Sequence, residues 1–313
     1  MTIEKYDPYK HGISQGLLTT FMRCREEARF FLLGLEQIRV SAPLQFGSLA
    51  HRVLELIYLN YKKVPSSKEV LTVLEKVYKE FLKEEGERLS PEGMENLESN
   101  MAILQAILPH YFAFYKKDFG VMKWIELEQK FSVPSPIPGV NLIGRIDGAY
   151  NERKELWLFE SKTKGRIEED NLTDALAFDF QNNVYQYALN KKYQKHPAGV
   201  LYNIIRRPGQ RLKKEENLRD FSKRIEEEVK KDPAYYFLRF EIAIPQSELK
   251  RFEKELTDVL QEFLKWCKGE LATYRNTSAC IQKFGPCRFL PKCANGEGGL
   301  YRMREVLFPE LVD

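Results

Sequence analysis

The segment ELWLFESKTK, residues 155–164, restricts the fold of this chain more than any other stretch of its sequence. Successive side chains of a β-strand point to opposite faces, so Leu156 and Leu158 lie on one face and Trp157 and Phe159 on the other. A strand that is apolar on both faces is a central, buried strand. The chain is therefore expected to contain an internal strand of a sheet that is covered on both sides.

The flanking sequence supplies further elements of this sheet. WIELEQKFSV alternates like a strand, SPIPG has the residues of a turn, and VNLIGRIDGAY follows, so residues 123–163 are predicted to form a three-strand meander. Residues 172–191 have a helical pattern, whereas residues 198–207 and 235–244 each have the pattern of a strand. A helix, three strands, a helix and a further strand predict an α/β fold with a central mixed sheet flanked by helices.

Helical periodicity is also clear outside this meander. Residues 46–61 form one amphipathic pattern, in which His51 and Glu55, four residues apart, share a face. Residues 64–120 contain further helical patterns, the first of which begins with a capping box at Ser66. We expect this region to be a helical insertion or lobe.

The remaining segments complete a predicted division of the chain. The charge-rich residues 211–232 are compatible with either a helix or a mobile loop, and Gln246–Tyr274 with a long helix. The predicted parts are an N-terminal helical region (1–45), an α/β core (46–63 and 121–245), the helical insertion (64–120), and a C-terminal helix with a cysteine-bearing segment (246–313).

The composition is that of an ordinary globular chain, with 43% hydrophobic and 30% charged residues. The formal charge of +4 does not identify a nucleic-acid partner, although a local basic groove is compatible with it. MTIEKYDPYKHGIS has no apolar run of signal-peptide length, and no apolar stretch is long enough to span a membrane, which predicts a cytoplasmic protein. Five cysteines, an odd number, argue against a disulfide framework and favour metal ligation or burial.

Three charged residues interrupt the apolar pattern of the meander. Glu160 and Lys162 are two apart and fall on one face, and pairing of the strands would bring Asp147 near Glu160. Two such carboxylates repel each other unless a divalent cation lies between them. Two carboxylates and one lysine suit metal-assisted phosphodiester hydrolysis, and the alternative is a salt bridge at the end of a strand.

The order of several motifs resembles the RecB-like branch of the PD-(D/E)XK nuclease superfamily, and within it the iron–sulfur members such as the CRISPR-associated exonucleases and the nuclease domain of AddB. The matching residues are Cys24 in TTFMRCREEARFF, His51 in FGSLAH, Asp147 in GRIDG, Glu160 and Lys162 in ESK, Gln181 and Tyr185 in QNNVYQY, and three cysteines near the C-terminus. The resemblance covers about residues 14 to 295, except the helical lobe and residues 211–232. It implies a restriction-endonuclease-like core.

The resemblance also implies roles for individual residues. The expected ligands of Mg²⁺ or Mn²⁺ are His51, Asp147, Glu160 and the carbonyl oxygen of Ser161, with Lys162 assisting the nucleophile. Together, Asp147, Glu160 and Lys162 are the predicted catalytic residues.

A second group of residues is expected to contact DNA. Gln181 and Tyr185 match the family's Q-x-x-x-Y signature and share a helix face that borders the site, where Tyr185 would stack on or position a nucleotide. Basic candidates for contact with the phosphate backbone are Arg145 next to Asp147, and Arg206 and Arg207 at the end of a core strand.

Three of the cysteines lie close together near the C-terminus. Cys280, Cys287 and Cys293 stand in SACIQKFGPCRFLPKCANG without the C-x2-C spacing that is common in zinc sites. Four thiolates satisfy either a four-iron four-sulfur cluster, which we favour, or a structural zinc ion. The resemblance names Cys24 as the fourth ligand, and Cys267, in the apolar helix pattern EFLKWCKGE, is the spare cysteine if Cys280 is not a ligand.

These observations predict a metal-dependent DNA nuclease, most readily an exonuclease that acts on single-stranded ends. The alternative is a catalytically inactive DNA-binding or recruitment protein, but none of the expected catalytic residues is missing. The chain has no G-x-x-x-x-G-K-[ST] segment for ATP phosphates, so any motor belongs to a partner. The expected partner is a helicase, a recombination protein or a CRISPR protein. The expected setting is DNA repair or a phage, and the expected location is the cytoplasm of a bacterium or of a phage-infected host.

Overall fold

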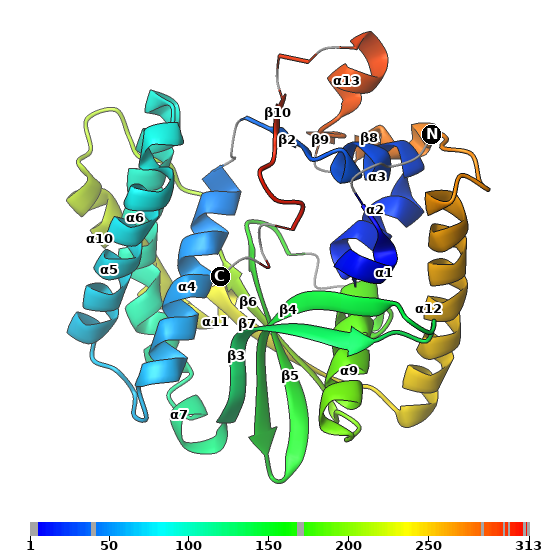
Figure 1. The fold of residues 1–313 in the computed structure, drawn as a ribbon. Helices are drawn as coiled ribbons and strands as arrows, with labels where there is room; N and C mark the ends of the chain where they lie inside the picture. Colours follow the sequence, from blue (N-terminus) through cyan, green and yellow to red (C-terminus); the bar gives the residue numbers. More distant parts are fainter. Residues whose placement is uncertain are drawn as a thin grey trace.

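The computed structural model describes residues 6–38, 42–167, 172–282, 285–296, 298–299, 301–308 and 311. Its centre is a six-stranded sheet in the order β1-β4-β5-β6-β7, in which β3 also pairs with β4 (Figure 1). The strands are β1 (Ile13–Ser14), β3 (Lys123–Pro134), β4 (Asn141–Glu152), β5 (Glu155–Lys164), β6 (Gly199–Arg206) and β7 (Phe237–Ala243).

The sheet is mixed, as predicted. The meander β3-β4-β5 is antiparallel, β5 pairs with β6 in parallel, and β6 pairs with β7 antiparallel. The predicted central strand β5 lies between β4 and β6, with Leu156 and Leu158 in the largest hydrophobic core and Phe159 in an aromatic cluster on the other face. Its doubly apolar pattern therefore reflects cover on both sides.

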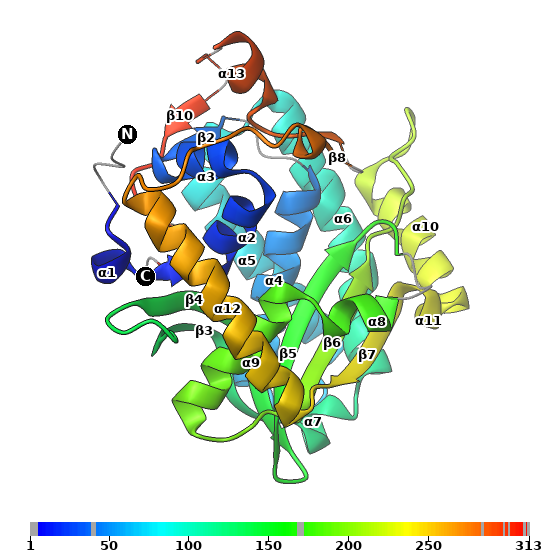
Figure 2. The ribbon, with the colours of Figure 1, turned by 90° about the vertical axis from the view of Figure 1, so that its right-hand side faces the viewer.

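Helices form a layer on each face of this sheet (Figures 1 and 2). One layer contains α2 (Gln15–Arg23), α3 (Arg25–Leu32), α9 (Phe180–Tyr193) and α12 (Gln246–Cys267). The other contains α4 (Ala42–Asn60), α5 (Ser67–Glu85), α6 (Pro91–Phe114) and α10 (Leu218–Lys231). The fold is therefore an α/β fold in which helices flank a central mixed sheet, as the sequence predicts.

The remaining elements are short. The short helices are α1 (Pro8–His11), η1 (Gly86–Arg88), α7 (Asp118–Val121), α8 (Leu172–Ala177), α11 (Pro233–Tyr236), η2 (Thr277–Ala279) and α13 (Leu290–Asn295). Two small sheets pair β2 (Leu35–Gln37) with β10 (Tyr301–Met303) and β8 (Ile281–Gln282) with β9 (Gly285–Pro286). Among the helices described here, none is long and apolar enough to cross a lipid bilayer.

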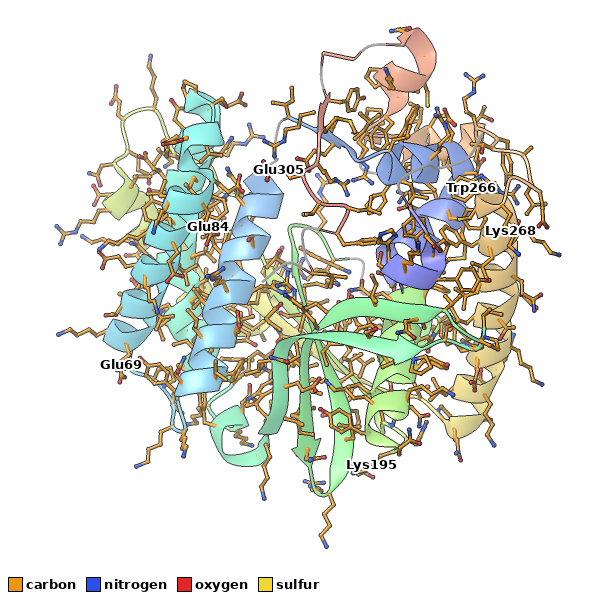
Figure 3. All side chains as sticks on the ribbon, in the orientation of Figure 1. Glu69, Glu84, Lys195, Trp266, Lys268 and Glu305 are labelled. Carbon is orange, nitrogen blue, oxygen red and sulfur yellow. The ribbon has the colours of Figure 1, made fainter. Side chains whose placement is uncertain are left out.

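The region 64–120 is helical, and its first helix begins as predicted. Ser66 and Glu69 form a reciprocal capping box at the start of α5, with Glu69 at the lower end of that helix in Figure 3. The segment 211–232, for which the sequence leaves two alternatives, contains helix α10. Phe221 and Ile225 of α10 are buried in a core that α4, α5 and α6 share, so α10 is part of the same layer.

Helix α12 is shorter than predicted. The apolar periodicity suggests a helix to Tyr274, but the helix ends at Cys267 and the chain turns at Gly269, whose φ of 79° lies in the left-handed region. Trp266, in the last turn and labelled in Figure 3, packs against Phe21 of α2 with ring centroids 5.2 Å apart. The residues after the turn run back towards the start of α3, where the main-chain N–H of Glu26 donates to the carbonyl of Tyr274.

Candidate active site

The candidate site lies where the sheet forks. One edge of β4 pairs with β1 at Leu142 and Ile143 and with β5 from Gly148 onwards. Arg145 and Asp147 lie between these two pairings and line a cavity of about 650 Å³. The strands thus leave a gap in which polar side chains meet without breaking the ladders on either side.

A group of three metal-ligating side chains lies in this gap. His51 Nδ1 is 3.6 Å from Asp147 Oδ2 and 3.5 Å from Glu128 Oε1. One ligand atom of each residue lies within 4.8 Å of the others. Burial by itself lowers the pKa of His51, but Asp147 and Glu128 together raise it to about 9. A proton on His51 therefore offsets the negative charge of these two carboxylates, as a bound cation would.

Glu160 approaches the same gap from the side of α9. It is fully buried, and its Oε1 accepts hydrogen bonds from Lys162 Nζ and, at 3.0 Å, from Gln181 Nε2. Oε2 is buried and has no hydrogen-bond partner among the described residues. Burial and the neighbouring Asp147 raise the pKa of Glu160 to about 7.

The lysine and the Q-x-x-x-Y pair are linked to Glu160. Although burial opposes it, Glu160 and Asp147 hold the pKa of Lys162 above its usual range, so the ammonium stays charged. Lys162 Nζ also donates to Gln181 Oε1 at 3.3 Å, and Gln181 Nε2 donates to the Tyr185 hydroxyl at 3.2 Å. Asp147 is held separately, because its Oδ2 accepts a 2.7 Å hydrogen bond from the main-chain N–H of Ser161.

The structure thus brings most of the predicted site residues together. It places around one gap His51, Asp147, Glu160, Ser161, Lys162, Gln181, Tyr185 and Arg145. Within this set, Glu160 is outside the compact ligand group of His51 and Asp147, because Lys162 and Gln181 hold its Oε1 on the α9 side.

Two predicted DNA-contacting arginines lie elsewhere. Arg206 is 7% exposed, and its Nε donates to the carbonyl of Tyr235 while its guanidinium stacks 4.0 Å from the centre of that ring. Arg207 donates to Asn100 and lines a second cavity beside α6. Neither residue lines the cavity that holds Arg145 and Asp147.

Glu128 is the site residue that the sequence interpretation missed. It stands on β3 between the pairs Leu127–Gly148 and Gln129–Ile146, and therefore opposite Asp147. Its φ of 48° lies in the left-handed region, which is unfavourable for a residue with a Cβ and often marks a functional site. The only signal in the sequence is an acidic residue on the predicted strand, and that signal does not separate Glu128 from Glu126.

Four cysteines lie together in a separate cavity. The cavity between the α2–α3 junction and the C-terminal segment is lined by Cys24, Cys280, Cys287 and Cys293. All are free thiols, and Cys24 Sγ accepts a 3.4 Å hydrogen bond from the main-chain N–H of Asn276. Burial, followed by the influence of Glu26 and the other three cysteines, raises the pKa of the Cys293 thiol.

Cys267 does not belong to this group. It packs against the largest hydrophobic core, and burial raises the pKa of its thiol to about 12. The spare cysteine is therefore a packed side chain of α12, whereas Cys280 lies with the other three.

Comparisons with known proteins found similar structures and a matching family. The chain shares 14% identity with the structure of a candidate exonuclease from Eubacterium rectale, with 88% of this chain and 89% of that chain covered and a TM-score of 0.49. It shares 12% identity with the structure of SSO0001, with 78% and 82% covered and a TM-score of 0.31. No curated protein matches the chain significantly. The family model of the PD-(D/E)XK nuclease superfamily matches residues 12–294, nearly the whole chain, and the chain therefore belongs to this superfamily.

Proposed function

We propose that this chain is a metal-dependent deoxyribonuclease that hydrolyses phosphodiester bonds, and that it acts as an exonuclease on single-stranded ends. The observation that carries the proposal is the buried Oε2 of Glu160, which has no hydrogen-bond partner among the described residues. The other oxygen of this carboxylate, Oε1, accepts a hydrogen bond from Lys162, and Asp147 is a neighbouring charge. A buried carboxylate oxygen without a partner is unfavourable unless a cation completes its surroundings.

The donor set fits a divalent cation. His51, Asp147 and Glu128 offer one imidazole nitrogen and two carboxylates within 4.8 Å of one another, and Glu160 Oε2 and the carbonyl of Ser161 are the further ligands that we propose. Carboxylate and carbonyl oxygens suit Mg²⁺ and Mn²⁺, and the imidazole favours Mn²⁺ over Mg²⁺. When bound, the cation would polarise the scissile phosphate and acidify a nucleophilic water molecule.

Lys162 supplies the positive charge that the protein itself contributes. Its ammonium group has three N–H donors, of which Glu160 and Gln181 each take one. The third remains for a phosphate oxygen or the attacking water. Gln181, fixed by Tyr185, holds both Lys162 and Glu160, so the Q-x-x-x-Y pair orients the acid and the lysine against each other.

The cavity dimensions favour one strand of DNA. Its volume of about 650 Å³ is within the range of roughly 300–1,000 Å³ found for pockets that enclose small molecules, so a nucleotide at a strand end fits it better than a duplex does. Arg145 and Tyr185 on its wall would bind the phosphate and stack on the base.

We also propose that Cys24, Cys280, Cys287 and Cys293 hold a four-iron four-sulfur cluster, with zinc as the alternative. The support is that these four sulfur-bearing side chains line one cavity although 256 positions separate Cys24 from Cys280. Four thiolates are the usual ligand set of such a cluster. A helicase, recombination or CRISPR partner remains part of the same proposal, since this chain lacks an ATP-binding motif.

The direct test is incubation of the protein with end-labelled single-stranded, double-stranded and circular single-stranded DNA, with Mn²⁺, Mg²⁺ or a chelator. We expect progressive shortening of linear single strands with Mn²⁺ or Mg²⁺, and no cleavage of circles. Lys162→Ala should abolish cleavage but retain folding and DNA binding, because the ammonium acts mainly on the transition state.

Lys123→Ala is the matched control, because Lys123 is an exposed lysine at the far end of β3. It should cleave like the wild type. DNA binding by the wild type without cleavage in any metal would favour the inactive DNA-binding alternative. Cleavage by Lys162→Ala together with lost binding would contradict the role of the lysine.

A further inference from the structure

A buried polar network lies directly behind the candidate site. Asn203, in the middle of β6, is fully buried and stands beside Ser161 of β5 in the parallel register. Its Nδ2 donates a 2.9 Å hydrogen bond to Ser161 Oγ. Its Oδ1 accepts from the Tyr111 hydroxyl at 3.0 Å and from Arg239 Nε at 2.9 Å. Every heavy polar atom of this amide thus has a partner.

The partners determine the orientation of the Asn203 amide. Arg239 has donors only, so the atom that faces it must be the amide oxygen, and the NH₂ group then faces Ser161. Ser161 Oγ is consequently an acceptor in a fixed position. The main-chain N–H of the same Ser161 donates to Asp147 Oδ2, which is also the carboxylate oxygen that lies 3.6 Å from His51 Nδ1.

Arg239 is itself rigidly held. Its side chain is 12% exposed and forms two hydrogen bonds, of 2.8 and 2.7 Å, with the carboxylate of Asp118. It also donates to the Tyr111 hydroxyl at 2.9 Å, and its guanidinium stacks 3.5 Å from the centre of the Tyr115 ring. A buried ion pair stabilises a fold weakly, because desolvation offsets the attraction. A role in fixing geometry accounts better for its place behind the site.

We infer that Asn203, held by Arg239 and Tyr111, is a positioning residue that sets the Ser161 peptide and, through it, the metal-binding orientation of Asp147. The inference rests on the proposed metal-dependent function and deepens it. Residues that hydrogen-bond to metal ligands orient them, and their replacement typically weakens metal binding about 10- to 100-fold. Asn203 does not line the cavity, and its hydrogen bond to the Ser161 hydroxyl links it to the proposed cation site.

The main test is Asn203→Asp, which keeps an acceptor for Arg239 and Tyr111 but loses the donor to Ser161. We expect about a tenfold weaker affinity for Mn²⁺, measured without DNA by the spin-resonance signal of free Mn²⁺. The KM for DNA should stay near the wild-type value, and kcat should recover at high Mn²⁺. A merely structural role would lower the melting temperature without this recovery.

Ser161→Ala tests the same relay from its other end and serves if Asn203→Asp does not fold. It removes the hydroxyl but retains the main-chain N–H to Asp147, so its effect on Mn²⁺ binding should resemble that of Asn203→Asp. The double variant should bind Mn²⁺ about as tightly as the single variant with the lower affinity, because both changes break the same chain of contacts. Additive effects of the two changes would overturn the inference.

Tyr58→Phe is the matched control. It removes a buried hydroxyl of the same network that donates to Asp118, at 2.6 Å, and not to Ser161. It should lower the melting temperature but retain wild-type Mn²⁺ affinity. An equal loss of Mn²⁺ affinity in Tyr58→Phe would overturn the specific role of Asn203.

The outcomes also separate this inference from the proposed function. If Asp147→Ala loses Mn²⁺ binding while Asn203→Asp and Ser161→Ala bind as tightly as the wild type, the positioning role is wrong and the nuclease proposal stands. If Asn203→Asp binds Mn²⁺ more weakly than the wild type but the wild type cleaves no DNA, the positioning role stands and the nuclease proposal is wrong. A wild type that binds no Mn²⁺ contradicts both.

Discussion

At the scale of single residues, Glu128 shows how the site departs from ordinary strand structure. Its backbone lies at a φ of 48° while its carboxylate reaches within 3.5 Å of His51 and 3.6 Å of Arg145. A side-chain-bearing residue in this region loses about 1–3 kcal/mol relative to a relaxed strand. The metal-ligating role proposed for Glu128 is open to a direct test.

Glu128→Gln should weaken Mn²⁺ binding by about tenfold, or roughly 1.4 kcal/mol. The change removes one of the three carboxylate charges, those of Glu128, Asp147 and Glu160, that would surround the cation. Glu126→Gln is the control on the same strand, since Glu126 pairs instead with Lys192 and Tyr193. It should lower thermal stability slightly and leave Mn²⁺ binding unchanged. Calorimetric titration of both variants would contradict the assignment if Glu126→Gln were the one that lost affinity.

The pKa shifts in the site predict that metal binding depends on pH. His51, with a pKa of about 9, and Glu160, with a pKa of about 7, are protonated below those values and must lose their protons to bind a cation. Mn²⁺ affinity should therefore rise with pH, about tenfold per unit between 7 and 8.5 and more steeply below 7. Calorimetry in buffers of different ionisation enthalpy would measure the released protons.

His51→Gln removes the proton with the higher pKa. It should bind Mn²⁺ more weakly, and its affinity should be nearly independent of pH between 7 and 8.5. An affinity of the wild-type protein that does not change between pH 6 and 8.5 would contradict both pKa assignments.

At the scale of elements, strand β6 lies between β5, which carries Ser161, and β7, which carries Arg239. It pairs with β5 in parallel and with β7 antiparallel, which sets Asn203 beside Ser161 and Arg239 beside Asn203. The close approach of β7 is possible because β6 begins at Gly199, where an added Cβ would come within 2.2 Å of the carbonyl oxygen of Ile242. The alignment of these strands therefore depends on a single missing side chain.

Gly199→Ala should destabilise the protein by about 1–3 kcal/mol, because the methyl group meets backbone that cannot move without disturbing the ladder. Gly165→Ala, just beyond β5, is the control, since an added Cβ there meets nothing within 4 Å. Its free energy of unfolding should remain close to the wild-type value. Urea denaturation of the two variants measures the difference, and equal stabilities would show that the β6–β7 pairing adapts.

At the scale of the whole molecule, residues near the two ends of the chain are held together. Strand β10 pairs with β2, and Cys24 lies in one cavity with the three cysteines of the C-terminal segment. This cavity and the cavity of the candidate active site have no lining residue in common. A cluster in the cysteine cavity would therefore act as a cross-link and not as part of the catalyst.

Cys24→Ser should lower the iron and sulfide content, the melting temperature and the solubility, because it removes a ligand that links distant segments. The wild type purified without oxygen should be brown with broad visible absorption, whereas zinc would leave it colourless. Cys267→Ser and Lys162→Ala should retain the colour. If Cys267→Ser bleaches the protein and Cys280→Ser does not, the proposed ligand set is wrong.

The fold follows from sequence to the extent that it depends on local periodicity. The doubly apolar β5, the meander and the capping box of α5 were all predictable, because alternation and 3.6-residue spacing are properties of neighbouring residues. The single helix predicted over residues 172–191 is instead two helices, α8 and α9, and Asp179 is the N-cap of α9. The end of α12 was not predictable, since its apolar pattern continues beyond the left-handed turn at Gly269.

The sequence by itself determined the family of this chain and its candidate acid, lysine and cysteine positions, because those residues stand in recognisable local motifs. Only the tertiary structure decided that Glu128 and not Glu126 faces Asp147, that Arg206 turns to Tyr235, and that Asn203 supports Ser161. These relations depend on strand register and on contacts between residues that are distant in the sequence. Arg206 and Tyr235 are 29 residues apart, and Asn203 and Ser161 are 42 apart. Periodicity tells which face a side chain is on, but the partner across that face is set by how the sheet and its two helical layers pack.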